Sequence, residues 1–584
     1  MNVLLYILIA AVCFALSSRI YARYIGRMLG EDAKNPTPAQ VYNDGRDYVP
    51  TKRYVVFAHH FSAIAGAGPI IGPTMAILYG FIPAWLWVVF GGIMIGAVHD
   101  FTVLFVSLRE GGKSVAEIAR KTLGKTGFNL FIIFTILMLV LLTSSFLTAT
   151  AISLTSLWPL SKIGVTEGET FLKTAVIDGV VMGKIGGIAS MSVIVITLCS
   201  PLLGWLIYRR GIKAIPAYAL AALICIVSIL LGIKIPITFS PTVWMMILSV
   251  YVLIAAGLPV WLILQPRDFI NVQILYAGIG LLVLSIFSTG LSGISLSVPS
   301  FNLADGVNQL GLIWPMMFIT IACGAISGFH ALVAGGTTGK QLSCECDARK
   351  VGFNAMLLES LLAVCVLLAV GIGLDFTDYK AIVWPTDPAV KSNPILGFSL
   401  AAGHLFNKGV GIPVALGTVF GILLVEGFVI TTLDAAVRLN RYLFEELWSI
   451  LFKNPPRIMQ HYWFNSFLAV VLMCILAYSN AFSALWPIFG AANQLLAALS
   501  LLAVSSWLLI RGRRYFFAAL PAVFMMATTV TSLFILLRNY LQKGNYILAV
   551  TDVFLLCLSI GVIVLSFKIF LRPVAAKTSE AVGR

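Results

Sequence analysis

Apolar runs long enough to cross a lipid bilayer recur along almost the whole sequence, and this feature limits the possible folds most. A membrane-spanning helix needs about 20 mostly apolar residues. Only 11% of the 584 residues are charged, whereas soluble proteins have about 25%. We predict an all-α polytopic membrane protein with about fifteen transmembrane helices, centred on residues 3–18, 60–78, 83–106, 128–157, 188–208, 214–233, 241–264, 270–290, 311–334, 353–373, 410–432, 464–480, 486–509, 515–537 and 546–571.

Lysine and arginine residues lie in the loops at every second connection between these runs, for example at 19–53, 109–125 and 511–514. Basic loops of membrane proteins stay in the cytoplasm. The alternation predicts an N-terminus outside and a C-terminus inside a cell's inner membrane. The formal net charge of +15 is spread over these loops, so we expect the lipid bilayer as a partner and no nucleic acid. Residues 393–406 are too short to span and are predicted as a re-entrant or surface helix.

A glycine- and proline-rich string, SAIAGAGPIIGP at 62–73, lies in the second predicted helix. Lipid forces helices to satisfy their backbone groups internally. We interpret the string as an unwound segment whose free amides and carbonyls bind a substrate or an ion. The alternative is close helix packing through small residues. The candidate substrate-binding residues are Ser62, Gly66, Gly68, Pro69 and Gly72.

A second string, GAISGFHALVAGGTT at 324–338, resembles the first and lies in a predicted helix of opposite direction. Two similar broken helices of opposite direction suggest inverted-topology repeats. A third candidate break lies at residues 255–259. The candidate substrate-binding residues of the second string are Ser327, Phe329, His330, Gly335, Gly336 and Thr337.

Ionisable residues are rare within the predicted helices, and each is therefore a candidate functional residue. Histidine titrates near neutral pH, which suits proton coupling. The alternative is a hydrogen-bonded histidine that joins two helices. The candidates for ion coupling are His59, His60, His99, Asp100 and His330, and Glu359 and Glu426 are further acids within predicted helices.

Polar residues also occur in two later predicted helices. Thr431 and Thr432 carry hydroxyls that suit a sodium ion, and they join the ion-coupling candidates together with Asp434. Asp434 and Arg438 are four residues apart and are expected to pair on one helix face. Amide side chains further along the chain, at 493 and 494, are expected to bond across helices.

Long and unusual strings carry a resemblance to a known family. They are HHFSAIAGAGPIIGP at 59–73, GAVHD at 96–100, SGFH at 327–330, GTTGK at 336–340, DAR at 347–349, TTLD at 431–434 and WPIFG at 486–490. Because they occur in this order from about residue 19 to 514, the sequence resembles the carbon starvation protein A family.

The resemblance implies a bacterial inner-membrane carrier of the amino acid–polyamine–organocation superfamily with a LeuT-like inverted-repeat core. It implies a secondary active transporter, not an enzyme, that imports a small carboxylate nutrient such as short peptides or pyruvate during carbon starvation. No cofactor is expected, and the coupling ion is H⁺ or Na⁺, with H⁺ favoured by the histidines. The repeats divide as five plus five or seven plus seven spans, and the sequence leaves this open.

Three segments are expected along the chain. Residues 1–54 hold the first transmembrane helix and a cytoplasmic loop, residues 55–510 form the transporter core, and residues 511–584 hold the C-terminal transmembrane helices. The alternatives to a carrier are an ion or solute channel and a metal-binding membrane sensor. No metal site is predicted, because Cys344 and Cys346 are poorly spaced for zinc, although metal binding at these cysteines or at the histidines stays open.

Overall fold

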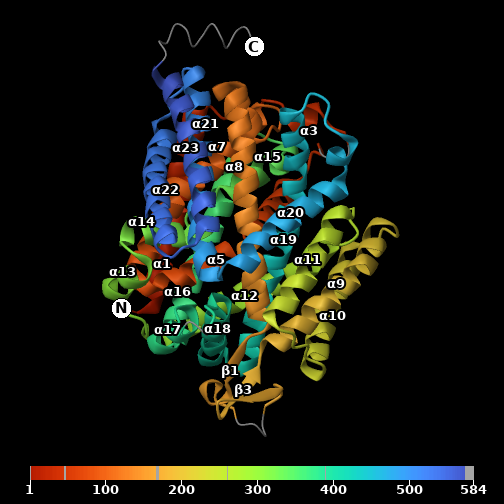
Figure 1. The fold of residues 1–584 in the computed structure, drawn as a ribbon, viewed down its shortest axis with the longest axis vertical. Helices are drawn as coiled ribbons and strands as arrows, with labels where there is room; N and C mark the ends of the chain where they lie inside the picture. Colours follow the sequence, from red (N-terminus) through yellow and green to blue (C-terminus); the bar gives the residue numbers. More distant parts are fainter. Residues whose placement is uncertain (1, 45–47, 166–169, 260, 388–389, 572–584) are drawn as a thin grey trace.

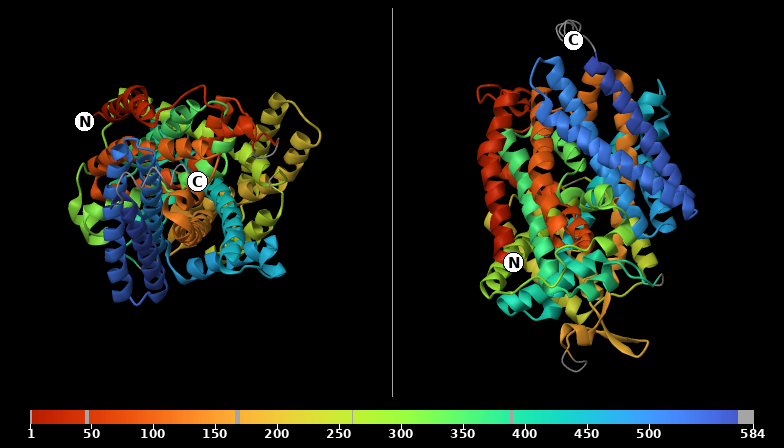
Figure 2. Two further views of the ribbon diagram at one scale, coloured as in Figure 1. Left: turned by 90° about the horizontal axis from the view of Figure 1, so that it is seen from above. Right: turned by 90° about the vertical axis from the view of Figure 1, so that its left-hand side faces the viewer.

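The computed structural model describes residues 2–44, 48–165, 170–259, 261–387 and 390–571. They form an elongated bundle of helices with a small β-sheet at one end (Figure 1). α1 (Val3–Leu16) begins nearer the end that carries the sheet, and α23 (Tyr546–Leu571) ends at the opposite end (Figure 2). The last part of the predicted C-terminal segment, residues 572–584, lies outside the described residues.

Each predicted transmembrane run corresponds to helical structure. Within the described ranges, 13 helices are long and apolar enough to cross a membrane, one bent pair could form a further span, and Pro241–Gly257 is a shorter apolar helix. Large apolar side chains such as Ile20, Leu198 and Leu520 are exposed on the outer surface, as lipid-facing helices require. The long helices outside the broken pairs are α1, α6 (Phe81–Gly91), α7 (Ala97–Arg109), α8 (Val115–Leu154), α9 (Gly186–Tyr208), α10 (Ala214–Lys234), α11 (Pro241–Gly257), α12 (Leu264–Leu291), α16 (Asn354–Gly373), α18 (Pro394–Val410), α19 (Val414–Leu451), α20 (Tyr462–Ser479), α21 (Phe482–Ile510), α22 (Phe516–Gln542) and α23.

Short elements connect the long helices. The loop between α8 and α9 forms an antiparallel sheet in the order β1-β3-β2, which the sequence reading did not predict. Its strands are β1 (Leu157–Pro159), β2 (Thr174–Ile177) and β3 (Val180–Lys184). The short helices are η1 (Ser17–Tyr21), α2 (Ala22–Leu29), α3 (Pro38–Val41), η3 (Gly92–Gly96), η4 (Leu160–Ile163), α13 (Leu303–Leu310), η7 (Arg349–Phe353), α17 (Phe376–Val383) and η8 (Arg457–Gln460).

The first glycine–proline string breaks a span, as predicted. α4 (Arg53–Ile64) ends before the string, and α5 (Gly68–Ala76) continues into η2 (Ile77–Tyr79) at an angle of 47° to α4. Proline is well tolerated in the first turn of a helix, where the amides have no intrahelical partner, and Pro69 occupies that turn of α5. The chain between the two helices, residues 65–67, is not helical.

The second string interrupts a span as well. α14 (Ile313–Ile321) and η5 (Ala322–Gly324) precede a non-helical stretch, and α15 (Phe329–Gly336) and η6 (Thr338–Lys340) follow it. Ala322 adopts a φ of 44°, which residues other than glycine rarely do. α5 packs against α14 and η5, whereas α4 packs against α15. The first half of one span therefore lies beside the second half of the other, so the two broken spans run in opposite directions.

Two series of helices follow the broken spans in matching order. After α5 come α7 preceded by the π-helical turn η3, then the 40-residue α8, and later α11 and α12. After α15 come α16 preceded by the π-helical turn η7, then α17 and α18, and then the 38-residue α19, α20 and α21. α8 packs on α21, and α19 packs on α12. We infer inverted repeats that start at the two broken spans, with the α9–α10 pair inserted in the first and α17 and α18 inserted in the second.

Two sequence predictions need correction. α18 covers the segment predicted as a re-entrant or surface helix, but its side chains are mostly buried against α12, α16 and α19, so it is not a surface helix. α11 ends at Gly257 and α12 begins at Leu264. The third candidate break therefore lies at the end of a helix and does not interrupt a span.

Candidate functional site

A buried cluster of histidines and carboxylates lies beside the second break. Asp100 on α7 accepts a hydrogen bond from Nδ1 of His99 at 2.7 Å and another from Nδ1 of His330 at 2.7 Å. On the other side of the same imidazole, Nε2 of His330 lies 3.2 Å from Oε2 of Glu359 on α16. All four side chains are at most 1% exposed. The predicted residues His99, Asp100 and His330 are thus brought together, and Glu359 joins them.

The two remaining candidate histidines on α4 have different surroundings. His60 is fully buried, and its Nδ1 lies 2.8 Å from Oγ1 of Thr338 on η6. This contact joins the first broken span to the end of the second. Thr337, the predicted residue, is instead the C-terminal cap of α15. His59 is exposed, and no hydrogen bond or ion pair among the described residues connects it to the cluster.

The glycines of the first string have two kinds of surroundings. A Cβ atom at Gly66 would lie 3.1 Å from Oγ1 of Thr432, so the break itself faces α19. A Cβ atom at Gly72 would lie 2.3 Å from the carbonyl oxygen of Ile321, and one at Gly68 would lie 2.4 Å from Sγ of Cys323. Gly68 and Gly72 therefore allow α5 to approach the second broken span closely. For these two residues the structure supports close helix packing, the alternative to substrate binding.

α21 binds the backbone groups that the second break frees. The amide of Gly328 donates to the carbonyl of Asn493 at 3.0 Å, and the amide of Phe329 donates to Oδ1 of Asn493 at 3.0 Å. The Asn493 side chain also donates to Oγ of Ser327 at 3.1 Å. Asn493 and Gln494 were predicted to bond across helices, and Nε2 of Gln494 does so by donating to the Phe318 carbonyl at 2.7 Å. The freed amides of Gly328 and Phe329 are therefore occupied by protein.

The last residues of the second string differ in the space around them. A Cβ atom at Gly335 would lie 2.8 Å from Cα of Ser114, so this glycine packs against the start of α8. A Cβ atom at Gly336 would meet nothing within 4 Å. Of the two, only Gly336 faces open space.

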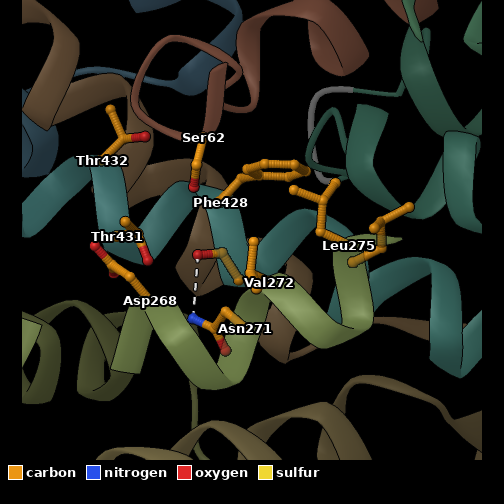
Figure 3. Close-up of a pocket in the computed structure, with 10 residues that line it drawn as sticks. Ser62, Asp268, Asn271, Val272, Leu275, Phe428, Thr431 and Thr432 are labelled. Atoms are coloured by element: carbon orange, nitrogen blue, oxygen red, sulfur yellow. Dashed lines mark hydrogen bonds between the residues drawn. The ribbon is translucent and has the colours of Figure 1, made fainter. Parts of the chain in front are cut away.

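A small cavity lies between α4, α12 and α19 (Figure 3). Its volume is about 20 Å³, and Ser62 on α4 faces it. Asp268 and Thr431 point toward one another across it, and Nδ2 of Asn271 donates to the carbonyl of Gly427 at 3.4 Å. The full lining is Ser62, Asp268, Asn271, Val272, Leu275, Leu424, Gly427, Phe428, Thr431 and Thr432. The predicted residues Ser62, Thr431 and Thr432 thus share one oxygen-rich cavity beside the first break.

Asp434 does not pair with Arg438 as predicted. It pairs with Arg267 on α12 at 2.8 Å and accepts a hydrogen bond from the hydroxyl of Tyr251 on α11 at 2.7 Å, and Arg267 in turn donates to Tyr251. Arg438 instead donates to the carbonyls of Ala255, at 2.6 Å, and of Leu258. The carbonyls at the end of α11 need donors because they have no intrahelical partner, and the arginine satisfies them.

Sequence reasoning missed several residues of this region. Glu359 was noted as an acid within a helix but not as a partner of His330. Arg267, which is 2% exposed in α12, was not among the candidate residues. A signal was present in the pair Arg267–Asp268, because two adjacent charges at the start of an apolar run are unusual. Their partners are about 160 residues further along the chain, so no local pattern identifies them.

A family model described as "Carbon starvation protein CstA" matches residues 2–390 and 375–532. The chain belongs to this family. It is 32% identical to a peptide transporter CstA of Campylobacter jejuni over 90% of this chain and 79% of that protein. It is 31% identical to the pyruvate/proton symporter BtsT of Escherichia coli over 91% of this chain and 81% of that protein. Among solved structures, MhsT in complex with L-phenylalanine covers 88% of this chain and 100% of its own, with 11% identity and a TM-score of 0.44.

The part of the chain that matches the CstA family includes the whole candidate site. The histidine cluster, the cavity between α4, α12 and α19, and Asn493 all lie before residue 532. α23 begins at Tyr546 and lies beyond the matched residues. The resemblance found in the motifs is thus confirmed over both broken spans and the helices that surround them.

Proposed function

We propose that this member of the CstA family is a secondary active transporter that imports a small carboxylate nutrient, short peptides or pyruvate, together with protons. Relatives that cover most of the chain are named as peptide transporters and as a pyruvate/proton symporter. The basic loops support a bacterial inner-membrane location with the N-terminus outside and the C-terminus in the cytoplasm. The expected partners are a small-molecule substrate and the bilayer.

The observation that carries the proposal is the position of His330 between two buried carboxylates. One imidazolium ion can neutralise Asp100 or Glu359, but not both. A net charge buried in a medium of low dielectric constant is costly, so the cluster is balanced when one further proton is bound at Glu359. Proton occupancy therefore depends on how closely α7, α15 and α16 approach one another.

Movement of the broken spans would couple this proton to the substrate. His330 lies two residues after the non-helical stretch that ends at Gly328, and His60 links α4 to the same region through Thr338. A rotation of α4 and α15 would change the distances around His330 and alter its protonation. We propose that Asp100 orients the imidazole, while His330 and Glu359 hold the transported proton.

The substrate path is proposed from the cavities. A cavity of about 810 Å³ opens at the end of the bundle that carries the β-sheet and reaches Met316 on α14 and Pro487 on α21. This end is the outer side in the proposed orientation. The cavity beside Ser62 holds only about 20 Å³, which is too small for pyruvate or a dipeptide. Substrate binding near Ser62, Gly66 and the amides at the start of α5 would therefore require the broken spans to separate. Helix N-termini favour carboxylates.

Uptake in proteoliposomes tests the proposal. Labelled pyruvate and labelled dipeptides should be offered with an inward proton gradient, with an inward sodium gradient, and with neither. We expect accumulation above the outside concentration with the proton gradient for at least one substrate. Equilibration without accumulation would indicate a channel, and dependence on sodium alone would assign the coupling to a sodium site such as Thr431 and Thr432.

A further inference from the structure

The chain between α2 and α4 lies at the end of the bundle opposite the β-sheet (Figure 1). We call its described parts, residues 30–44 and 48–52, the inner segment. This end is the cytoplasmic side in the proposed orientation, whereas the cavity of about 810 Å³ opens at the other end. α4, the first half of the first broken span, begins directly after the inner segment. Any movement of α4 at its cytoplasmic end therefore involves this segment.

The last residues of the inner segment pair with the chain that follows the second broken span. The amide of Val49 donates to the carbonyl of Lys340, the last residue of η6, at 3.2 Å. The amide of Thr51 donates to the carbonyl of Gln341 at 2.9 Å. The hydroxyl of Ser343 donates in return to the carbonyl of Thr51 at 3.0 Å. These bonds tie the start of α4 to the cytoplasmic end of the second broken span.

A buried carboxylate holds the earlier residues of the inner segment to the same loop. The side chain of Glu345 is only 4% exposed. It accepts hydrogen bonds from the amide of Asp32 at 2.9 Å and from Nδ2 of Asn35 at 3.2 Å. Arg109, at the end of α7, donates to Oε1 of Glu345 at 2.8 Å and pairs with Oε2 at 2.6 Å. One carboxylate thus joins the inner segment, the loop after the second broken span and the end of α7.

A second ion pair and a cavity lie near this carboxylate. Glu31 pairs at 3.0 Å with Arg349, which begins the π-helical turn η7 before α16. A cavity of about 170 Å³ is lined by Asn35, Arg109 and Glu345, among other residues. Well-packed interiors leave few voids larger than a water molecule. The inner segment is therefore held mainly by hydrogen bonds and ion pairs, and its packing here is loose.

Contacts of this kind suit an element that opens and closes. Buried apolar surface resists exposure to water, whereas hydrogen bonds can be exchanged for bonds to water at a small net cost. Release of a substrate from the broken spans toward the cytoplasm requires α4 to move away from α15 at this end. The bonds of the inner segment oppose that movement, and they can break without disrupting the apolar core.

We propose that the inner segment is a latch that must open before a substrate can leave toward the cytoplasm, and that Glu345 and the Glu31–Arg349 pair hold it shut. Glu345 is a positioning residue, because it acts through α4 and the loop after the second broken span. The proposal rests on the proposed function, which assigns this end to the cytoplasm. The latch is closed in a structure whose large cavity opens at the opposite end, as alternating access requires.

Labelling of Cys323 from the cytoplasmic face tests the proposal. Cys323 is buried at the second break, where its Sγ accepts a hydrogen bond from Asn493 at 3.4 Å. Inside-out membrane vesicles that hold the full chain should be treated with a membrane-impermeant maleimide, without substrate or ion gradient. Peptide mass spectrometry then follows each cysteine separately. Glu345→Gln should raise the labelling rate of Cys323 roughly tenfold or more, because hydrogen bonds to a charged group are lost.

Two further variants complete the comparison. Glu31→Gln removes the other ion pair of the latch and should also raise the labelling rate of Cys323, so the test stays decisive if Glu345→Gln does not fold. Glu117→Gln is the matched control. Glu117 pairs with Arg120 one turn along α8 at the same end of the bundle, and this variant should label as the wild type does. A rate at Cys323 that is unchanged in both latch variants would overturn the proposal.

Cys365 separates opening of the latch from a loss of structure. It is 2% exposed within α16, so a partly unfolded chain exposes it together with Cys323. We expect faster labelling of Cys323 alone. Faster labelling of both cysteines would show that Glu345 only supports the fold, and this result would also overturn the proposal. Because labelling needs neither substrate nor a proton gradient, its outcome is independent of the uptake assay that tests the proposed function.

Discussion

Nδ1 of His330 donates a hydrogen bond to Asp100 at 2.7 Å and thereby ties α15, the helix that follows the second break, to α7. The opposite nitrogen of the imidazole lies near Glu359 on α16. A single side chain thus connects three helices at the point where a span is interrupted. Any motion of α15 must change at least one of these contacts, and this is the physical basis of the proposed coupling.

Replacing His330 should impair both transport and stability. His330→Ala leaves Asp100 and Glu359 buried near each other without the imidazole, and breaking such a buried pair costs about 3–5 kcal/mol. We expect proton-driven uptake to be lost and the thermal unfolding midpoint to fall. His461→Ala, at an exposed histidine, is the control and should change neither. Wild-type uptake by His330→Ala would remove this residue from the mechanism.

Two glycines of the strings should differ in their tolerance of alanine. Gly72→Ala places a methyl group 2.3 Å from the Ile321 carbonyl oxygen, so α5 and α14 must move apart. Overpacking of this kind costs about 1–3 kcal/mol. Gly336→Ala adds a methyl group in open space and should leave the unfolding midpoint nearly unchanged. Equal midpoints for the two variants would show that close packing at Gly72 does not limit stability.

Asn493 should be needed to hold the second break. Asn493→Ala leaves the amide of Phe329 without its partner at a buried position, and such a loss costs about 1–3 kcal/mol. Ser505→Ala removes a hydroxyl of the same helix that donates only to the carbonyl of Leu501, and its effect should be small. Thermal unfolding of both variants checks the difference. A midpoint for Asn493→Ala as high as that of Ser505→Ala would contradict the assigned role.

Stability should depend on pH through Glu110, which lies in the loop between the end of α7 and the start of α8. Burial alone would raise the pKa of its carboxyl, but Lys121, Trp507 and Arg511 outweigh burial, so the pKa lies below its usual value of 4.5. A lowered carboxyl pKa adds stability above the unfolded-state pKa, and this stability is lost as the pH falls below about 4.5.

Arg511→Ala tests this dependence. Arg511 donates to Glu110 at 2.7 Å but is 44% exposed, so its removal should cost about 1 kcal/mol or less at pH 7. The difference from the wild type in unfolding midpoint should shrink when both are measured at pH 4. The same difference at both pH values would show that the contribution of Arg511 does not depend on the Glu110 charge.

The elements that depend on local sequence were predictable. The length of the apolar runs predicted the positions of the spans. Pro69 and its neighbouring glycines predicted the first break, because a helix in lipid has few ways to accommodate these residues. The grouping of His99, Asp100 and His330 was anticipated only in part, since rarity marks such residues as important without showing their partners.

Contacts between residues far apart along the chain could not be predicted from the sequence. The four-residue spacing of Asp434 and Arg438 suggested a local pair. Instead, the buried Arg267 of α12 forms the ion pair with the Asp434 carboxylate. Likewise, α21 binds the groups freed at the second break through Asn493, about 165 residues away from them. Nothing in the second string shows that its amides are already occupied.

The most direct measurement of the central claim compares wild type with Glu359→Gln in proteoliposomes, in two assays. Glutamine keeps the size of the side chain but cannot hold the proposed proton. We predict that Glu359→Gln fails to accumulate labelled substrate under a proton gradient yet still exchanges labelled for unlabelled substrate at equal pH, because exchange needs no net proton movement. Proton-driven accumulation by Glu359→Gln at the wild-type level would contradict the claim that this cluster carries the proton.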